Sequence, residues 1–437
     1  MRLVQRVSPS VVALRMVRPG GADGVVVHEQ GSGSILDTAG HVLTNAHVVR
    51  WGARGEATFG DGLSAPFEVV ARFADEDLAI VRLEAERPLR PLALGRSHDL
   101  MLGEPALVIG APGGLLGSIS TGVISGIGRT AATDQGFLVD AVQITAEVNG
   151  GNSGGPLINA LGEQIGVVTS KQGGADGIAF AIAADRVRAL LPGALAPEAR
   201  RGFWLGVEVD PLAPEARVVA VAEGSPAAAA GVRSGDVLRR VGALPVTDGA
   251  VFQLALLELL PGGEVELELD RGGAALVLAA RLAPWPVDEP ASPGDLVAGL
   301  SYAVHDGVWD RLPELGGSAP SEEGSLERVR VPPSRLGTDA FAVALRGYVR
   351  VPSDGFYRFW IGSDDGSRLR IGSRIALDND GLHAHAEAWV QGRLRAGLHP
   401  VEVKMFEAFG DESLSLHWEG PGFGREEVPA AAFLRHP

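Results

Sequence analysis

Residues 151–156 read Gly-Asn-Ser-Gly-Gly-Pro and form the most informative stretch of the sequence. A serine becomes an effective nucleophile only when a base accepts its proton and N–H donors face the developing oxyanion. The three glycines allow the backbone to turn tightly, so that successive N–H groups point into one concavity. Because glycine-rich turns are common, this stretch predicts a nucleophile at Ser153 only if a histidine and an acid accompany it.

A histidine and an aspartate occur in the order that such a serine requires. His47 lies in Thr-Asn-Ala-His-Val-Val (44–49), just after an apolar run, and Asp77 begins Asp-Leu-Ala-Ile-Val (77–81). Either residue alone is more often structural, as a core histidine or as a cap at the start of a strand. Residues 11–180, however, consist of short β-rich runs broken by glycine, which predicts a sandwich or barrel. The order His, Asp, Ser in such a segment is typical of chymotrypsin-like serine proteases.

Further stretches extend this interpretation to a family. Residues 7–190 resemble the protease domain of the HtrA/Deg family of serine proteases. The resemblance rests on the three motifs above and on Val-Ser-Pro-Ser-Val-Val (7–12), Gly-Ser-Gly-Ser-Ile (31–35) and Gly-Ile-Ala-Phe-Ala-Ile (177–182). It implies a chymotrypsin-like double β-barrel and an endopeptidase that cleaves unfolded or misfolded proteins. It also implies that catalysis requires no cofactor.

The same resemblance assigns roles to individual residues. Ser153 would be the nucleophile, His47 the general base and then the general acid, and Asp77 the residue that orients the imidazole. Gly151 and Ser153 would donate the oxyanion N–H groups, with Asn152 as a further candidate. A non-catalytic holdase or adhesin that keeps the protease fold is the alternative. Scaffold descendants commonly lose a member of the triad, and this sequence keeps all three.

The substrate pocket leaves two alternatives open. In chymotrypsin-like folds the residue six positions before the nucleophile lies at the base of the primary specificity pocket, and here that residue is Glu147. Trypsin-like enzymes place an acid there to bind arginine or lysine, whereas HtrA relatives usually carry a small residue and prefer aliphatic side chains. A carboxylate facing an empty apolar pocket is costly, so Glu147 should meet a basic substrate or turn to solvent. The other predicted substrate-binding residues are Val148, Thr169 and Ser170.

The middle of the chain, residues 202–283, resembles a bacterial PDZ domain of the α+β class. Residues 203–207, Phe-Trp-Leu-Gly-Val, match the loop whose backbone N–H groups receive the C-terminal carboxylate of a peptide. Such peptides bind by β-augmentation, in which backbone bonds give affinity and side-chain pockets give selectivity. The alternative is a structural spacer with an unused groove. The resemblance implies that peptide C-termini bind at Trp204, Leu205, Gly206 and Val207.

Residues 296–437 resemble the anthrax protective-antigen-type (PA-fourteen) domain, a β-sandwich found in adhesins, glycosidases and toxins. The match includes Ser-Asp-Asp-Gly-Ser-Arg-Leu (363–369) and Trp-Glu-Gly-Pro-Gly (418–422). In carbohydrate-binding members, paired aspartates hold a Ca²⁺ ion that ligates sugar hydroxyls, and an asparagine from a later loop helps. Oxygen donors of this kind suit a hard cation. The two alternatives are a structural turn, or binding of Ca²⁺ and of glycan or cell wall through Asp364, Asp365 and Asn379.

Length and composition agree with a mainly β, multidomain chain. At roughly 150 residues per domain, 437 residues predict about three domains. We expect the double barrel over residues 1–197, the PDZ domain over 202–283 and the sandwich over 296–437, with linkers near 192–201 and 283–293. The net charge of −16 is spread along the chain with no basic segment, so nucleic-acid binding is not expected.

Targeting signals are sparse. The sequence has no cysteine, which excludes disulfides, thiolate zinc sites and a cysteine nucleophile but leaves the compartment open. The sequence contains no run of about 18 apolar residues, so no membrane-spanning helix is predicted. Arginines interrupt residues 1–19, so no signal peptide is recognised there. The family resemblance implies a periplasmic or extracellular location, with any export signal missing from this chain. The oligomeric state stays open, and a homo-oligomer is one alternative.

Overall fold

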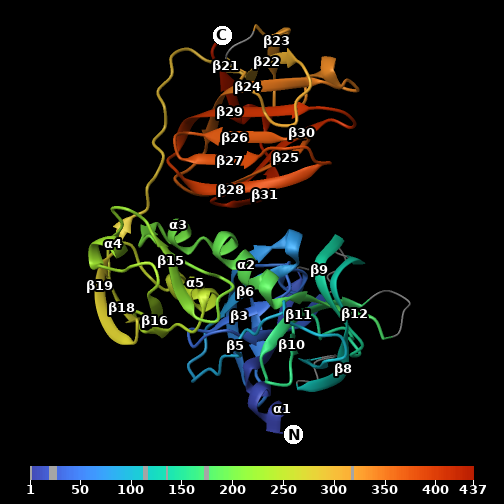
Figure 1. Ribbon diagram of the computed structural model, residues 1–437, viewed down its shortest axis with the longest axis vertical. Helices are drawn as coiled ribbons and strands as arrows, with labels where there is room; N and C mark the ends of the chain where they lie inside the picture. The colour runs from blue at the N-terminus through green and yellow to red at the C-terminus, as the bar shows by residue number, and fades with distance from the viewer. Residues whose placement is uncertain (1, 19–26, 112–116, 134–135, 172–176, 316–318) are drawn as a thin grey trace. The chain divides into compact units, whose positions relative to one another are not determined.

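The computed structural model describes residues 2–437 except 19–26, 112–116, 134–135, 172–176 and 316–318. The chain divides into two compact units. Residues 1–201 and 205–283 form the first unit, and residues 202–204 and 284–437 form the second (Figure 1). Strands make up most of the regular structure in both units.

Two closed six-stranded barrels follow α1 (Arg2–Val7), which confirms the double β-barrel predicted from the sequence. Each barrel encloses its own apolar core, and closure leaves no open sheet edge. In order of pairing, the first barrel contains β1 (Val11–Arg18), β2 (Val27–Ile35), β3 (His41–Thr44), β6 (Leu78–Leu83), β5 (Ser64–Phe73) and β4 (Arg54–Thr58). The second contains β10 (Pro156–Ile158), β11 (Gln164–Lys171), β12 (Ala179–Ala183), β9 (Gly136–Ile144), β8 (Ser118–Thr133) and β7 (Pro105–Gly110).

The segment expected to be a linker at 192–201 is helical. Helix α2 (Ala184–Leu195) continues through Pro192, and α3 (Pro197–Arg201) follows directly. A proline inside a helix removes one backbone hydrogen bond, which is why the sequence suggested a break. Leu191 and Leu195, however, are buried in the core of the first unit. Tertiary packing of such a face stabilises a helix more than local propensity does.

The middle segment has the α+β architecture expected for it. A five-stranded path of sheet is accompanied by α4 (Pro226–Ala230) and α5 (Gly249–Leu257). Helix α5 is apolar on all sides and almost entirely buried, so it needs protein on more than one face. Its Leu254 and Leu257 share one core with Leu191 of α2, which explains why this segment and the barrels form a single unit. The sheet order is β14 (Val207–Val209), β15 (Ala216–Val221), β16 (Val237–Val241), β18 (Glu264–Arg271) and β19 (Ala274–Arg281), with β17 (Leu244–Pro245) beside β16.

The second unit contains an eight-stranded and a four-stranded antiparallel sheet with a continuous apolar core. Tyr357, Phe359 and Trp418 lie at the centre of that core. The larger sheet contains β21 (Val297–Ala298), β32 (Phe433–Arg435), β24 (Phe341–Val351), β29 (Gly397–Glu407), β26 (Ser367–Ile371) and β27 (Ile375–Asn379), with β22 (Leu300–Asp306) and β23 (Glu322–Leu326) beside β24. The smaller contains β28 (Ala386–Leu394), β25 (Gly355–Asp364), β30 (Ser413–Gly420) and β31 (Phe423–Glu427).

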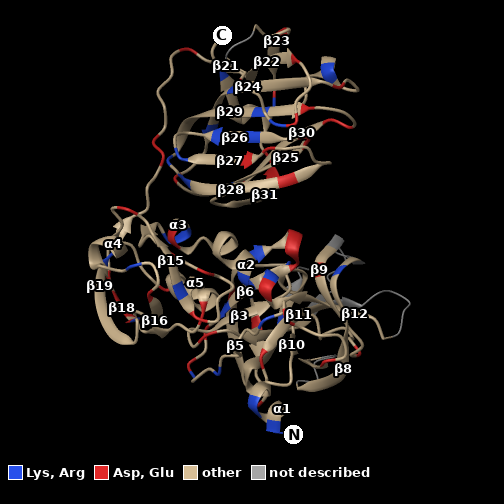
Figure 2. Cartoon of the chain, in the orientation of Figure 1, with Lys and Arg blue, Asp and Glu red and all other residues tan. Residues whose placement is uncertain are grey.

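Charged residues of both signs occur in both units, whereas tryptophan and tyrosine are concentrated in the second. Lysine and arginine are interspersed with aspartate and glutamate in both units (Figure 2). Every tryptophan except Trp51, and every tyrosine, lies in the second unit. No helix among the residues placed by the structure is long and apolar enough to cross a membrane.

Candidate active site

Strand pairing in the first barrel brings His47 and Asp77 together. His47 begins a short 3-10 helix (His47–Val49) just after β3, and Asp77 immediately precedes β6. Strands β3 and β6 are antiparallel neighbours, so the two side chains emerge at the same end of the pair. The Nδ1 atom of His47 lies 2.8 Å from Oδ1 and 2.9 Å from Oδ2 of Asp77. Since a carboxylate only accepts hydrogen bonds, Nδ1 carries the proton and Nε2 is left as the acceptor.

Several groups hold the Asp77 side chain and backbone in place. The residue is buried and has a left-handed backbone with φ of 49°, which aspartate tolerates better than most residues. Asn45 Nδ2 donates to the Asp77 carbonyl oxygen at 2.8 Å, and the His47 backbone N–H donates to Oδ1 at 3.1 Å. Thr169 Oγ1 in β11 donates to Oδ2 at 2.6 Å. Thr169, expected to bind substrate, therefore links the second barrel to the His47–Asp77 pair.

Ser153 lies in the loop before β10 and comes from the second barrel. Its hydroxyl donates to the carbonyl oxygen of Thr169 at 3.0 Å. Among the residues that the structure describes, Ser153 Oγ makes no hydrogen bond to His47. The hydroxyl hydrogen is therefore directed at the Thr169 carbonyl oxygen and not at an imidazole acceptor.

The loop around Ser153 is shaped by glycine and fastened by Ser32. Gly154 has φ of 81°, and a Cβ at this position would overlap Thr44 Oγ1 and the Ser32 carbonyl oxygen. The Ser32 N–H donates to the Ser153 carbonyl oxygen at 2.8 Å, and Ser32 Oγ donates to the Gly151 carbonyl oxygen at 2.7 Å. The Gly-Ser-Gly-Ser motif around Ser32 carried part of the family resemblance, but no role was predicted for its serines. The signal that could have indicated such a role is the presence of serine hydroxyls in a buried segment.

The three candidate oxyanion donors differ in their hydrogen bonding. The Asn152 N–H donates to the Asn149 carbonyl oxygen at 3.0 Å and is used within the turn. The N–H groups of Gly151 and Ser153 have no acceptor in the described part of the chain. Gly151 has φ of 101°, a conformation that favours glycine. Two unpaired N–H groups beside the Ser153 hydroxyl are the arrangement that an oxyanion requires.

The predicted substrate-binding residues differ in exposure. Glu147 is exposed, and its Oε1 accepts a hydrogen bond from Asn149 Nδ2 at 3.1 Å. Val148 is buried. The side chain of Ser170 lies outside the described residues. Of the two orientations considered for the Glu147 carboxylate, the structure has the one directed to solvent.

The loop expected to receive a peptide carboxylate already contacts a carboxylate of this chain. The backbone N–H groups of Leu205 and Gly206 donate to Oε1 of Glu198 at 2.6 and 3.0 Å. Glu198 lies in α3, and its burial raises the pKa of the carboxyl above the ordinary value, although the two N–H donors oppose the rise. Val207 lies in β14 and pairs with β15, whereas Trp204 is partly buried just before this loop. Glu198 falls in the segment predicted to be a linker, so no role was predicted for it.

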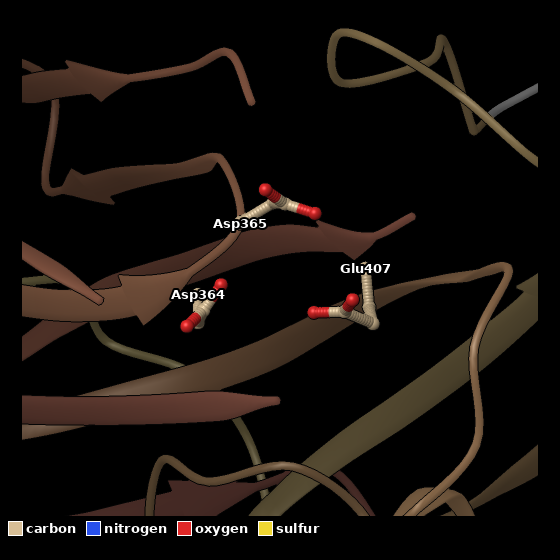
Figure 3. A group of neighbouring side chains, drawn as sticks. All are labelled: Asp364, Asp365 and Glu407. Carbon is tan, nitrogen blue, oxygen red and sulfur yellow. The ribbon is translucent and has the colours of Figure 1, made fainter. Parts of the chain in front are cut away.

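Three carboxylates meet at one end of the sandwich in the second unit. Asp364 ends β25, Asp365 follows it, and Glu407 ends β29; one carboxylate oxygen of each lies within 4.8 Å of the others. Figure 3 shows the three side chains surrounding a common space. Asp365 is fixed by the N–H groups of His383 and Ala408, which donate to its two oxygens at 2.9 and 3.0 Å.

Glu407 is the member of this group that the sequence did not reveal. It is fully buried, and neither carboxylate oxygen has a hydrogen-bond partner among the residues that the structure places. Burial, reinforced by the charges of Asp365 and Asp364, raises the pKa of Glu407 to about 7. Asn379, the expected third ligand, donates its amide nitrogen to Ser363 and Ser367 at 3.3 and 3.4 Å. A buried, unpaired carboxylate is the position at which a cation would relieve the largest electrostatic cost.

Comparisons with known proteins agree with this architecture. Residues 24–167 match the trypsin-like peptidase domain, residues 204–282 the PDZ domain and residues 318–432 the PA14 domain. Two closed barrels that place a histidine, an aspartate and a serine at their junction, followed by a PDZ domain, define a trypsin-like serine endopeptidase.

Similar full-length proteins narrow this class. The serine protease HhoA of Synechocystis is 37% identical over 58% of this chain and 70% of its own length. A DegP-like periplasmic serine endoprotease of Halomonas elongata is 30% identical over 75% of this chain and 71% of its own. The chain belongs to the HtrA/Deg family of serine proteases. Among solved structures, HtrA-type protease AlgW with tripeptide is 28% identical over 65% of this chain and 96% of its own, with a TM-score of 0.41.

Proposed function

We propose that this endopeptidase cleaves unfolded or misfolded proteins by Ser-His-Asp acyl-enzyme chemistry at His47, Asp77 and Ser153. The observation that carries the proposal is the bidentate approach of Asp77 to His47 Nδ1, at 2.8 and 2.9 Å. This contact fixes the tautomer in which Nε2 accepts a proton, as a general base must. The unpaired N–H groups of Gly151 and Ser153 support the same assignment.

The proposed reaction begins with rotation of the Ser153 hydroxyl away from the Thr169 carbonyl. Ser153 Oγ attacks the scissile carbonyl carbon while its proton passes to His47 Nε2. The resulting oxyanion accepts hydrogen bonds from the N–H groups of Gly151 and Ser153. His47 then gives the proton to the leaving amine, which departs as the C–N bond breaks. Water, activated by the same imidazole, hydrolyses the acyl-enzyme and releases Ser153.

The test is cleavage of an unfolded model protein by the full chain and by Ser153→Ala. Loss of the nucleophile should lower the rate by at least about 1,000-fold. The melting temperature should stay within about a degree, because Ser153→Ala removes a single partly buried hydroxyl. Labelling by a fluorophosphonate should occur on the wild type and not on the variant. Wild-type turnover by Ser153→Ala would refute the assignment and favour a non-catalytic scaffold.

For specificity we propose the small aliphatic preference of the family. The exposure of Glu147 and its bond to Asn149 support this choice, because the carboxylate is satisfied without a basic substrate. Cleavage-site profiling decides the question. Val, Ala or Ile should dominate before the scissile bond, and Glu147→Ala should leave the profile unchanged. Dominant Arg or Lys that disappears in Glu147→Ala would establish basic specificity instead.

We further propose that the PDZ domain recognises peptide C-termini and that the protein acts in the periplasm or outside the cell. The N–H pair of Leu205 and Gly206 supports the first proposal, since it already binds a carboxylate oxygen. A peptide with an apolar C-terminal residue should therefore bind through its free carboxylate. Loss of binding on amidation of the peptide is the expected result. The periplasmic names of relatives support the proposed location.

A second function is proposed for the PA14 domain, a Ca²⁺ site formed by Asp364, Asp365 and Glu407. Three clustered carboxylates, one of them buried and unpaired, support it. Oxygen donors of this charge suit Ca²⁺, and a bound ion could take hydroxyls of a glycan as further ligands. Asn379 remains a candidate additional donor through its amide oxygen. Calorimetric titration of the full chain with Ca²⁺ should show binding that Asp364→Asn weakens by at least about tenfold. If neither protein binds Ca²⁺, or if both bind it with the same affinity, Asp364 is not a ligand and the structural turn is the remaining interpretation.

A further inference from the structure

The contact between Glu198 and the PDZ loop has a consequence for ligand binding. We propose that Glu198 is an internal competitor for the carboxylate-binding loop, so that a peptide C-terminus must displace it before binding. This inference rests on the proposed role of the PDZ domain and specifies how that site is regulated.

The stoichiometry of donors makes the two occupants mutually exclusive. Each backbone N–H donates one proton, and both Leu205 and Gly206 direct theirs to Oε1 of Glu198, at 2.6 and 3.0 Å. A peptide carboxylate that used the same donors would leave the Glu198 carboxylate without its partners. It would also bring a second negative charge close to the first. Loss of hydrogen bonds to a charged group and repulsion between like charges both disfavour simultaneous binding.

The position of Glu198 is fixed by its neighbours in α3 and α5. Pro197 and Ala199, which flank it, are buried. Arg200 Nε donates to the Leu195 carbonyl oxygen at 2.9 Å, and Arg201 Nε donates to the Leu257 carbonyl oxygen at the end of α5. The carboxylate is therefore held at the loop without a large loss of conformational freedom. A preorganised internal group competes at a high effective concentration.

This arrangement lowers the apparent affinity for peptide by the fraction of time that the loop is open. If the loop is open about 1–10% of the time, the apparent Kd is about 10- to 100-fold weaker than the intrinsic value. Removing the internal carboxylate should recover that factor. The gain should appear only for ligands that carry a free carboxylate, because an amidated terminus does not compete for charge-assisted bonds in the same way.

The experiment measures binding of a decapeptide ending in valine, with a free or an amidated C-terminus, to the full-length protein. Glu198→Ala should bind the free-carboxylate peptide about 10- to 100-fold more tightly than wild type does. Glu198→Gln keeps the size of the side chain but not its charge, and its affinity for this peptide should lie between those of wild type and Glu198→Ala. Glu264→Ala removes one exposed acid from β18 of the same domain and is the charge-matched control. It should bind as wild type does.

A second measurement reports the contact without any peptide. Hydrogen exchange of the segment containing Leu205 and Gly206 should accelerate in Glu198→Ala and not in Glu264→Ala. Circular dichroism checks that each variant is folded, and Glu198→Gln serves if Glu198→Ala is not. Unchanged affinity together with unchanged exchange would overturn the competition while leaving peptide recognition by the wild type intact. Failure of every variant to bind the free-carboxylate peptide would overturn peptide recognition, and with it the competition.

Discussion

Thr169 joins two of the three proposed catalytic residues. Its hydroxyl donates to Asp77 Oδ2 at 2.6 Å, and its carbonyl oxygen accepts from Ser153 Oγ at 3.0 Å. Thr169→Val keeps the shape of the side chain but removes the donor to a buried carboxylate. Hydrogen bonds to charged groups contribute about 1.5–3 kcal/mol, so we expect kcat/KM to fall by roughly 10- to 100-fold. Steady-state hydrolysis of a peptide substrate measures the effect.

Thr169→Ser is the matched control because it retains the hydroxyl. It should keep most of the wild-type rate, whereas a general loss of packing at this position would impair both variants. Wild-type kcat/KM in Thr169→Val would show that Asp77 does not depend on this donor.

Ser32 and Ser34 provide a second comparison between neighbouring buried hydroxyls. Ser32 Oγ donates to the Gly151 carbonyl oxygen at 2.7 Å and accepts from the Ala111 N–H at 3.0 Å. Ser34 Oγ is buried and has no hydrogen-bond partner within the described part of the chain. Ser32→Ala should lower the free energy of unfolding by about 1–3 kcal/mol and reduce activity, because it removes two buried hydrogen bonds to backbone groups. These groups keep only the longer bond from the Ala111 N–H to the Gly151 carbonyl oxygen, at 3.4 Å. Ser34→Ala should be neutral or slightly stabilising. Denaturant unfolding of both variants tests the difference, and equal losses would contradict it.

Residues that belong to a short motif could be predicted from the sequence. The contacts that these residues make in the fold could not. His47, Asp77 and Ser153 could be located because each has a short, informative neighbourhood. The bond from Thr169 to Asp77 depends on how β11 of one barrel lies against the other, which no local pattern encodes. Glu407 was missed for the same reason, since it is far in sequence from Asp364 and joins it only through the pairing of the sandwich. The direction of the Glu147 carboxylate also could not be predicted, because it depends on the conformation of the loop that contains it.

Helix α5 begins with a cap that is also an ion-pair partner. Asp248 Oδ1 accepts from the N–H groups of Ala250 and Val251 at 2.9 and 3.0 Å, and it lies 3.6 Å from Arg188 of α2. Both charged side chains are buried. Asp248→Ala should therefore cost about 2–4 kcal/mol, from a lost cap and an unpaired buried charge. Asp248→Asn keeps a capping oxygen and should cost less. Wild-type stability of both variants in denaturant unfolding would contradict this account.

The linker expected near residues 192–201 was wrong, because it was predicted from composition alone and the segment is helical. The proline- and alanine-rich stretch 192–201 resembled a linker. Its apolar residues are nevertheless buried in the core of the first unit, and this packing stabilises the helix. Composition describes solvent preference, whereas burial of a helix face depends on partners remote in sequence.

The raised pKa of Glu407 should make the stability of the second unit depend on pH in an unusual direction. Burial and the charges of Asp365, Asp364, Asp339 and Glu412 raise its pKa to about 7, above the ordinary value of 4.5. Between these values the native carboxyl binds a proton that the unfolded chain has lost, so the free energy of unfolding decreases as pH rises. In EDTA we expect a loss of roughly 1–3 kcal/mol between pH 5 and pH 8. Calorimetric unfolding of the full chain measures it in the transition of this unit.

Two additions separate this effect from other titrations. Glu407→Gln should flatten the decrease and stabilise the metal-free protein at pH 8. Ca²⁺ should raise the stability of the wild type more at pH 8 than at pH 5, because binding requires the deprotonated carboxylate. A Ca²⁺ effect equal at both pH values, or unchanged in Glu407→Gln, would remove Glu407 from the site.

The placement of the aromatic residues determines what an optical experiment can observe. Because Trp309, Trp360, Trp389, Trp418 and every tyrosine lie within residues 296–437, ultraviolet emission from the full chain reports mainly on the sandwich. Smaller contributions come from Trp51 in the barrels, Trp204 at the start of the PDZ domain and Trp285 between the PDZ domain and the sandwich. Melting of the barrels would pass with little change in that signal. Trp51, which lies shortly after His47 and has the Arg50 guanidinium 4.9 Å from its ring centroid, is the single indole of the first unit. With the other indoles replaced by phenylalanine, its emission would become a local optical probe beside the proposed general base.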